Sequence, residues 1–141
     1  MEKGSYTLIL RLNEAAEVEI GSLGTLELRK GFYAYNGSAN GSGGFKRLER
    51  HLEQRGKKHW HIDYINHSPK TGIVAFFKSP GADAECSVSQ ELSLEFEAVA
   101  GFGCSDCNCN SHLYYSDSRR ELLEAVKGAY NGHADLTFLQ E

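Results

Sequence analysis

Two tyrosines, an arginine and a histidine in the first third of the chain have the side chains that phosphodiester hydrolysis requires. Tyr6 and Tyr35 lie in expected strands, and Arg47 and His51 lie on the helix expected next. The reaction must activate water, hold a phosphate while charge builds on its oxygens, and release an alkoxide. A tyrosine hydroxyl can orient the water or accept its proton, and an arginine donates two fixed hydrogen bonds to a phosphate. Singly each residue fits an ordinary structural role, but together they predict a site.

A carboxylate would complete this set, because Mg²⁺ and Mn²⁺ prefer oxygen ligands. The helix expected after Asp83 carries Glu85 in its first turn and Glu91 further along. Either Glu85 or Glu91 could serve as such a ligand. A carboxylate in the first turn also stabilises a helix through the helix dipole, so a structural role for Glu85 stays open.

The segment 57–64 places two imidazoles, an indole and a carboxylate within eight positions. In an extended backbone His59, His61 and Asp63 would share one face, because side chains alternate along a strand. We expect His61 to hydrogen-bond the scissile phosphate or the leaving oxygen. The structural alternative is that His61 pairs with Asp63 or with a backbone carbonyl.

A cluster of thiols near the end of the domain has the residue types of a tetrahedral zinc site. Its members are Cys104, Cys107, Cys109 and His112. Common structural zinc sites use paired Cys-x2-Cys knuckles separated by a longer loop, and this spacing differs from them. Two interpretations therefore remain open. One is a structural Zn²⁺ ion, with Cys86 as an alternative to Cys104, and the other is that buried thiols pack a loop. In the second case His112 would cap a helix or contact DNA.

Hydrophobic periodicity predicts the elements that position these residues. Alternating apolar residues indicate strands over 5–12, 18–20 and 26–28, the last two forming a hairpin, and a high aromatic content indicates a strand over 31–38. The apolar run 72–77 predicts a central strand covered on both faces. Helices are expected over about 45–54, from Asp83 to about Val99, and over about 118–131, where Ser118 and Glu121 have capping-box spacing.

The charge is unevenly distributed along the 141 residues. The net charge of -4 divides into +4 over residues 46–58 and -8 elsewhere, so an acidic chain carries one basic segment. We assign DNA contacts to this segment and the turn before it: Gly37, Ser38, Arg50, Arg55, Lys57, Lys58 and His59. Length and composition predict a single domain over 1–141, with a core at about 4–115 and a C-terminal helix at about 118–131. Without an apolar span or signal peptide, we expect a cytoplasmic, nucleoid-associated protein without membrane contact.

Several sequence blocks resemble the GIY-YIG nuclease superfamily. They are 4–6, 35–39, Arg47 and 50–51. Blocks 59–64 and 101–113 resemble, more narrowly, its small DUF123 or Uri-type branch. The resemblance runs from residue 4 to about residue 113 and implies an α+β fold with a small central antiparallel sheet flanked by helices. Two motif positions are polar, Ser5 and Asn36, where the superfamily usually has aliphatic residues; we expect both to alternate away from the tyrosines.

This resemblance also implies a function. It implies a divalent-metal-dependent DNA endonuclease, structure- or lesion-selective in DNA repair, in which Tyr6 and Tyr35 handle the attacking water. Arg47 and His51 would hold the phosphate. Glu85, which matches the pattern of the branch better than Glu91, would bind Mg²⁺ or Mn²⁺, with Glu91 in reserve. The alternative is a non-catalytic nucleic-acid-binding or zinc-binding adaptor with the same fold. The implied partners are branched or damaged DNA and a DNA repair glycosylase or another repair protein.

Overall fold

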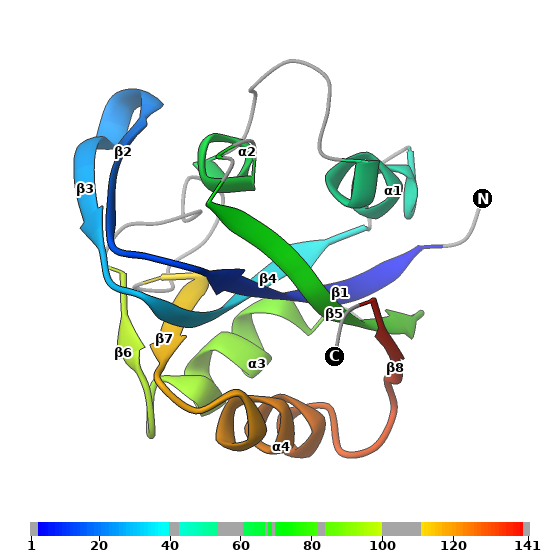
Figure 1. The fold of residues 1–141 in the computed structure, drawn as a ribbon. Helices are drawn as coiled ribbons and strands as arrows, with labels where there is room; N and C mark the ends of the chain where they lie inside the picture. Colours follow the sequence, from blue (N-terminus) through cyan, green and yellow to red (C-terminus); the bar gives the residue numbers. More distant parts are fainter. Residues whose placement is uncertain are drawn as a thin grey trace.

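A six-stranded sheet forms the middle layer of the molecule, in the order β6-β7-β4-β1-β5-β8 (Figure 1). The computed structural model describes residues 3–39, 43–53, 61–66, 68, 70–81, 84–99 and 111–139. All five strand pairings in the sheet are antiparallel. The strands are β1 (Gly4–Leu12), β4 (Gly31–Ser38), β5 (Thr71–Pro80), β6 (Glu97–Ala98), β7 (Leu113–Ser116) and β8 (Asp135–Phe138).

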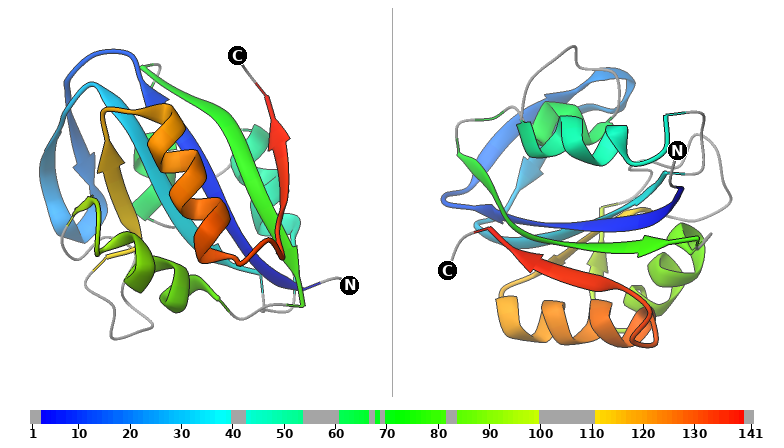
Figure 2. Two further views of the ribbon diagram at one scale, coloured as in Figure 1. Left: turned by 90° about the horizontal axis from the view of Figure 1, so that it is seen from below. Right: turned by 90° about the vertical axis from the view of Figure 1, so that its right-hand side faces the viewer.

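Helices cover both faces of this sheet (Figure 2). One face carries α1 (Lys46–Glu53), α2 (His61–Asn66) and a separate hairpin of β2 (Ala16–Ile20) and β3 (Gly24–Leu28) joined by the short helix η1 (Gly21–Leu23). The other face carries α3 (Glu85–Leu92) and α4 (Arg119–Ala129). The expected α+β architecture, an antiparallel sheet flanked by helices, is therefore confirmed. In the described residues no helix is both long and apolar enough to cross a membrane.

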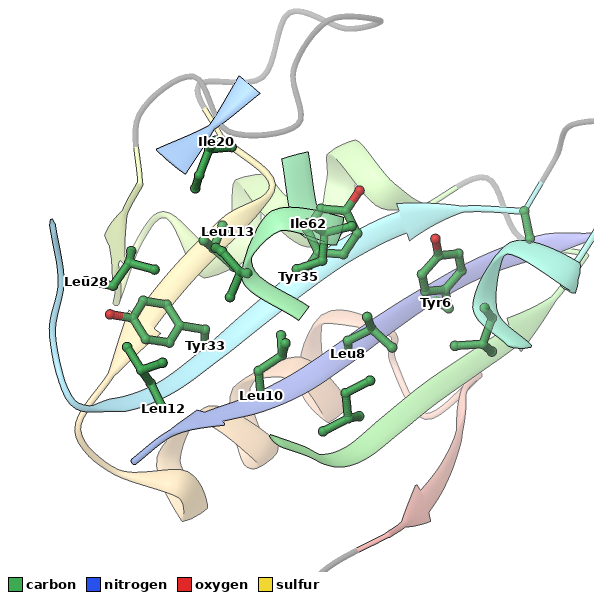
Figure 3. Close-up of a cluster of buried hydrophobic side chains, with 14 of the residues drawn as sticks. Tyr6, Leu8, Leu10, Leu12, Ile20, Leu28, Tyr33, Tyr35, Ile62 and Leu113 are labelled. Carbon is green, nitrogen blue, oxygen red and sulfur yellow. The ribbon is translucent and has the colours of Figure 1, made fainter. Parts of the chain in front are cut away.

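The alternation along β1 divides the interior into two cores. Tyr6, Leu8, Leu10 and Leu12 point into the core under α1, α2 and the hairpin (Figure 3). Ile9 points into the second core, which α3 and α4 close. The period of two read from the sequence thus assigns each side chain of β1 to the correct core.

The second side of the sheet contains a buried polar network. Thr7 Oγ1 donates to Asn36 Oδ1 at 2.7 Å, so the Tyr130 hydroxyl, 2.8 Å away, must donate to Thr7. Asn36 Nδ2 in turn donates to Ser89 Oγ at 2.9 Å, and Ser5 Oγ accepts from the Ala84 backbone N–H at 2.8 Å. Ser5 and Asn36 therefore face away from Tyr6 and Tyr35, as expected, and they fasten α3 to the sheet, whereas Thr7 fastens the end of α4 through Tyr130.

This network predicts a loss of stability at alkaline pH. Burial raises the pKa of Tyr130 to about 12, from a usual value of 10.0. Because the folded state holds this proton more tightly, the stabilisation is complete below pH 10 and is lost as the pH rises through about 12. We expect the unfolding free energy to fall more steeply from pH 10 to pH 12 for the natural chain than for Tyr130→Phe. Urea unfolding across that range measures both slopes, and equal slopes would contradict the prediction.

Several segments differ from the sequence-based expectation. The helix expected to run to Val99 ends at Leu92, where Ser93 Oγ donates to the Gln90 carbonyl and β6 then pairs with β7. Strands β7 and β8 were not predicted, because their exposed or mixed residues lack a clean alternation. The capping residue of α4 is confirmed, since Ser118 Oγ accepts from the Glu121 N–H.

Candidate functional site

The hydroxyl of Tyr6 lies at the centre of the candidate site. Tyr6 is fully buried, and its hydroxyl is 3.1 Å from Nε2 of His51 on α1. Gly37 lies directly opposite Tyr6 in the β1–β4 register. A Cβ atom on Gly37 would lie 2.3 Å from Cζ of Tyr6, so only glycine leaves room for the phenol. Gly37, predicted as a DNA contact, therefore shapes the tyrosine pocket.

Side chains from four further elements act electrostatically on the Tyr6 hydroxyl. Burial raises its pKa well above the usual value, and Tyr35, Glu85 and Asp63 raise it further, whereas Arg47 lowers it. Tyr6 and Tyr35 rise from the same face of adjacent strands (Figure 3). The structure thus brings together the groups predicted from β1, β4, α1 and α3.

Arg47 connects the first turn of α1 to the end of β4. Its Nη1 donates to the backbone carbonyl of Ser38 at 2.9 Å. The glycine-rich loop before α1 delays Arg47 along the sequence, yet the guanidinium still reaches the strand end that carries Tyr35. Arg47 is partly exposed, unlike the phenol of Tyr6. It therefore lies where an anionic ligand can approach.

His51 is enclosed by protein groups on both sides of its ring. Its side chain is 1% exposed, and its Nδ1 lies 3.4 Å from Oδ1 of Asp63. The Tyr35 ring packs edge-on against it, with centroids 6.3 Å apart. Arg50 Nη2 lies 3.5 Å from the other Asp63 oxygen. Both imidazole nitrogens thus already face side chains, Tyr6 on one side and Asp63 on the other.

The segment that carries Asp63 is helical. Residues 61–66 form α2, so the extended conformation expected over 61–64 is wrong, and positions 61 and 63 do not share one face. Residues two apart on a helix do not face each other. The Asp63 side chain instead lies in the core beside His51. No local sequence pattern indicated this contact. His59 and the side chain of His61 lie outside what the structure describes.

Glu85 lies in the first turn of α3, at the same end of the sheet. Its side chain is 22% exposed, and its Oε2 is 3.8 Å from Nδ1 of the buried His112. On the other side of that imidazole, Nε2 is 4.0 Å from Sγ of Cys86. Glu91, the alternative ligand, lines a groove between α3 and α4 together with Glu95, Glu121 and Glu124. Of these two carboxylates, Glu85 acts electrostatically on the Tyr6 hydroxyl.

The metal predictions fall on different parts of the chain. Within the ranges that the structure describes, no three His, Cys, Asp or Glu side chains gather as a metal site. Cys104, Cys107 and Cys109 lie outside those ranges. A single carboxylate still suits Mg²⁺, which keeps several water ligands and takes others from a phosphate. Glu85, a partly exposed oxygen ligand, fits that requirement.

The predicted DNA contacts are only partly described. Arg55, Lys57 and Lys58 lie outside the described residues, and Arg50 is 41% exposed while paired with Asp63. A further cation, Lys78, was missed: it lies opposite Tyr6 in the β1–β5 register, with its ammonium 4.5 Å from the Phe45 ring centroid. Only the register of β5 against β1 reveals it.

Fold and site together define an α+β protein in which one buried tyrosine hydroxyl contacts an imidazole and is affected electrostatically by a second phenol, a guanidinium and two carboxylates. The chain belongs to the family described as domain of unknown function DUF123, which matches residues 5–134. This match confirms the narrower part of the resemblance seen in the sequence. Comparison with curated proteins and comparison with solved structures each give no significant match.

Proposed function

We propose that this protein is a divalent-metal-dependent DNA endonuclease of the GIY-YIG type. The observation that supports the proposal most is the set of groups that act on the Tyr6 hydroxyl. His51 contacts it, and Tyr35, Arg47 and Glu85 act on it electrostatically. Hydrolysis of a phosphodiester needs a base near the attacking water, a cation at the phosphate and a carboxylate for a metal ion. These groups supply all three.

Exposure assigns the roles of these side chains. Arg47, partly exposed at the end of β4, would donate to the non-bridging phosphate oxygens, where the charge increases during the reaction. Tyr6 and Tyr35, which are buried, would orient and deprotonate the water. A divalent ion held by Glu85 would polarise the phosphate and stabilise the departing oxygen. Both ring nitrogens of His51 face protein side chains, so His51 would act on the reaction through Tyr6 and not by binding the phosphate.

The substrate we propose is branched or damaged DNA, met in the cytoplasm at the nucleoid with a repair glycosylase or another repair protein as partner. The basic segment 46–58 supports a DNA partner because it is positive within an acidic chain. One small domain leaves little surface for reading bases beyond its phosphate contacts. Selection by DNA shape, not by sequence, follows from that limit.

A cleavage assay tests this function. The purified chain is incubated with labelled flap, four-way junction, abasic-site and plain duplex DNA, with Mg²⁺ or Mn²⁺. We expect cleavage of a branched or damaged substrate that EDTA abolishes and excess Mg²⁺ restores, because the carboxylate of Glu85 alone cannot stabilise the transition state. Cleavage at an equal rate by Tyr35→Phe would contradict the proposed site. DNA binding without any cleavage would favour the adaptor alternative.

A further inference from the structure

We propose that Asp63 is a positioning residue: it holds His51 with its proton on Nδ1, so that Nε2 takes the hydroxyl proton of Tyr6. This inference rests on the proposed function, because it states how Tyr6 becomes the base that activates water. It adds a residue of α2 to a site whose other members lie on β1, β4, α1 and α3. The arrangement Asp63–His51–Tyr6 has the order carboxylate, imidazole and hydroxyl that activates a nucleophile in other enzymes.

Hydrogen-bonding capacity fixes the direction of the relay. Asp63 Oδ1 lies 3.4 Å from Nδ1 of His51, and both side chains are almost fully buried, at 3% and 1% exposure. An ionised carboxylate only accepts, so the ring nitrogen that faces it carries the proton. In a neutral imidazole the other nitrogen then has a lone pair. That nitrogen, Nε2, is 3.1 Å from the Tyr6 oxygen, so Tyr6 donates to it.

Neighbouring groups hold Asp63 and His51 in this geometry. Arg50 Nη2 lies 3.5 Å from Oδ2 of Asp63 and favours its ionised form. Asn66, one turn further along α2, donates from Nδ2 to the backbone carbonyl of His51 at 2.8 Å. This second contact ties α2 to α1 independently of Asp63. The carboxylate is therefore not the only group that fixes the two helices against each other.

The proton balance of the reaction follows from this arrangement. Tyr6 gives its proton to Nε2 of His51, and the imidazolium is stabilised by the Asp63 carboxylate. The phenolate of Tyr6 takes a proton from water, and the hydroxide forms a bond to phosphorus. The bond from phosphorus to the leaving oxygen breaks, and that oxygen keeps the electron pair and takes a proton from solvent. His51 returns its extra proton to solvent, so one water is consumed for each phosphodiester cut.

The tautomer of His51 is measured without any DNA. Two-bond ¹H–¹⁵N NMR spectra of the labelled full chain distinguish a protonated ring nitrogen from one with a lone pair. In the natural chain we expect a proton on Nδ1 and a lone pair on Nε2 of His51. We expect Tyr6→Phe to change the ¹⁵N chemical shift of Nε2. We also expect Asp63→Asn to change the tautomer population of His51. Asp117→Asn, a control at an exposed position, should leave that population unchanged. A proton on Nε2 in the natural chain would overturn the proposal, whether or not the protein cuts DNA.

Cleavage kinetics then test whether Asp63 acts through Tyr6. We expect Asp63→Asn to lower the single-turnover rate by about 10- to 100-fold, as for other residues that orient an imidazole, while DNA affinity stays unchanged. In a Tyr6→Phe background the same substitution should have no further effect. Full additivity of the two changes would overturn the relay. If the natural chain cuts no DNA tested, the proposed function fails, and the NMR result still decides the position of the proton.

Discussion

Replacing Arg47 with alanine is expected to lower the rate of DNA cleavage by about 100- to 1,000-fold, the usual effect of removing one preorganised donor from a transition state. The guanidinium is held at the end of β4 by the Ser38 carbonyl, 2.9 Å away, and it lowers the pKa of Tyr6, whereas Tyr35, Glu85 and Asp63 raise it. Its loss would therefore remove a phosphate donor and disfavour the tyrosinate. Single-turnover cleavage of the preferred DNA with saturating Mg²⁺ measures the change.

A matched substitution separates this effect from a general loss of positive charge. Arg120 on α4 is 87% exposed at its side chain and pairs with Glu124, on the opposite side of the sheet. Arg120→Ala removes the same charge and should cleave at the natural rate. Arg47→Lys should recover only part of the activity, because an ammonium lacks the planar pair of donors. If Arg47→Ala and Arg120→Ala cleave alike, Arg47 has no role in the reaction.

A Gly37→Ala substitution is expected to reduce both stability and activity. The added Cβ would lie 2.3 Å from Cζ and 2.6 Å from the hydroxyl oxygen of Tyr6, well inside van der Waals contact. Overpacking of this kind costs about 1–3 kcal/mol of unfolding free energy, since buried neighbours yield only in part. Tyr6 must also move away from His51, and a misplacement of about 1 Å can lower a rate by about 100-fold. Urea unfolding and the cleavage assay measure the two effects.

The control for this change is Gly128, on α4. No atom lies within 4 Å of the Cβ that Gly128→Ala would add. Alanine is favoured over glycine inside a helix by about 1 kcal/mol, so this variant should be as stable as the natural chain or more stable, and equally active. A stable and active Gly37→Ala variant would show that the Tyr6 ring adapts, and that its position is not critical.

Some elements were predictable because their signals are local. The alternating strands β1 and β4, the hairpin and the capped start of α4 depend on residues a few positions apart, and these were confirmed. The segment 61–66 was misjudged because a run of six residues with mixed polarity fits a strand or a helix equally well. Strands β7 and β8 form because β4 and β5 offer them open hydrogen-bonding edges, which no local pattern shows.

The sequence by itself determined the types of the site residues and the family of the chain. Tyr6, Tyr35, Arg47 and Glu85 were all named from motif order, because a motif preserves the identity and spacing of reactive groups. Only the tertiary structure decided what each one contacts. Asp63 meets His51, Gly37 makes room for Tyr6, and His112 lies between Glu85 and Cys86. These contacts join residues of different strands and helices, so they depend on strand register and helix packing, which distant parts of the chain set together.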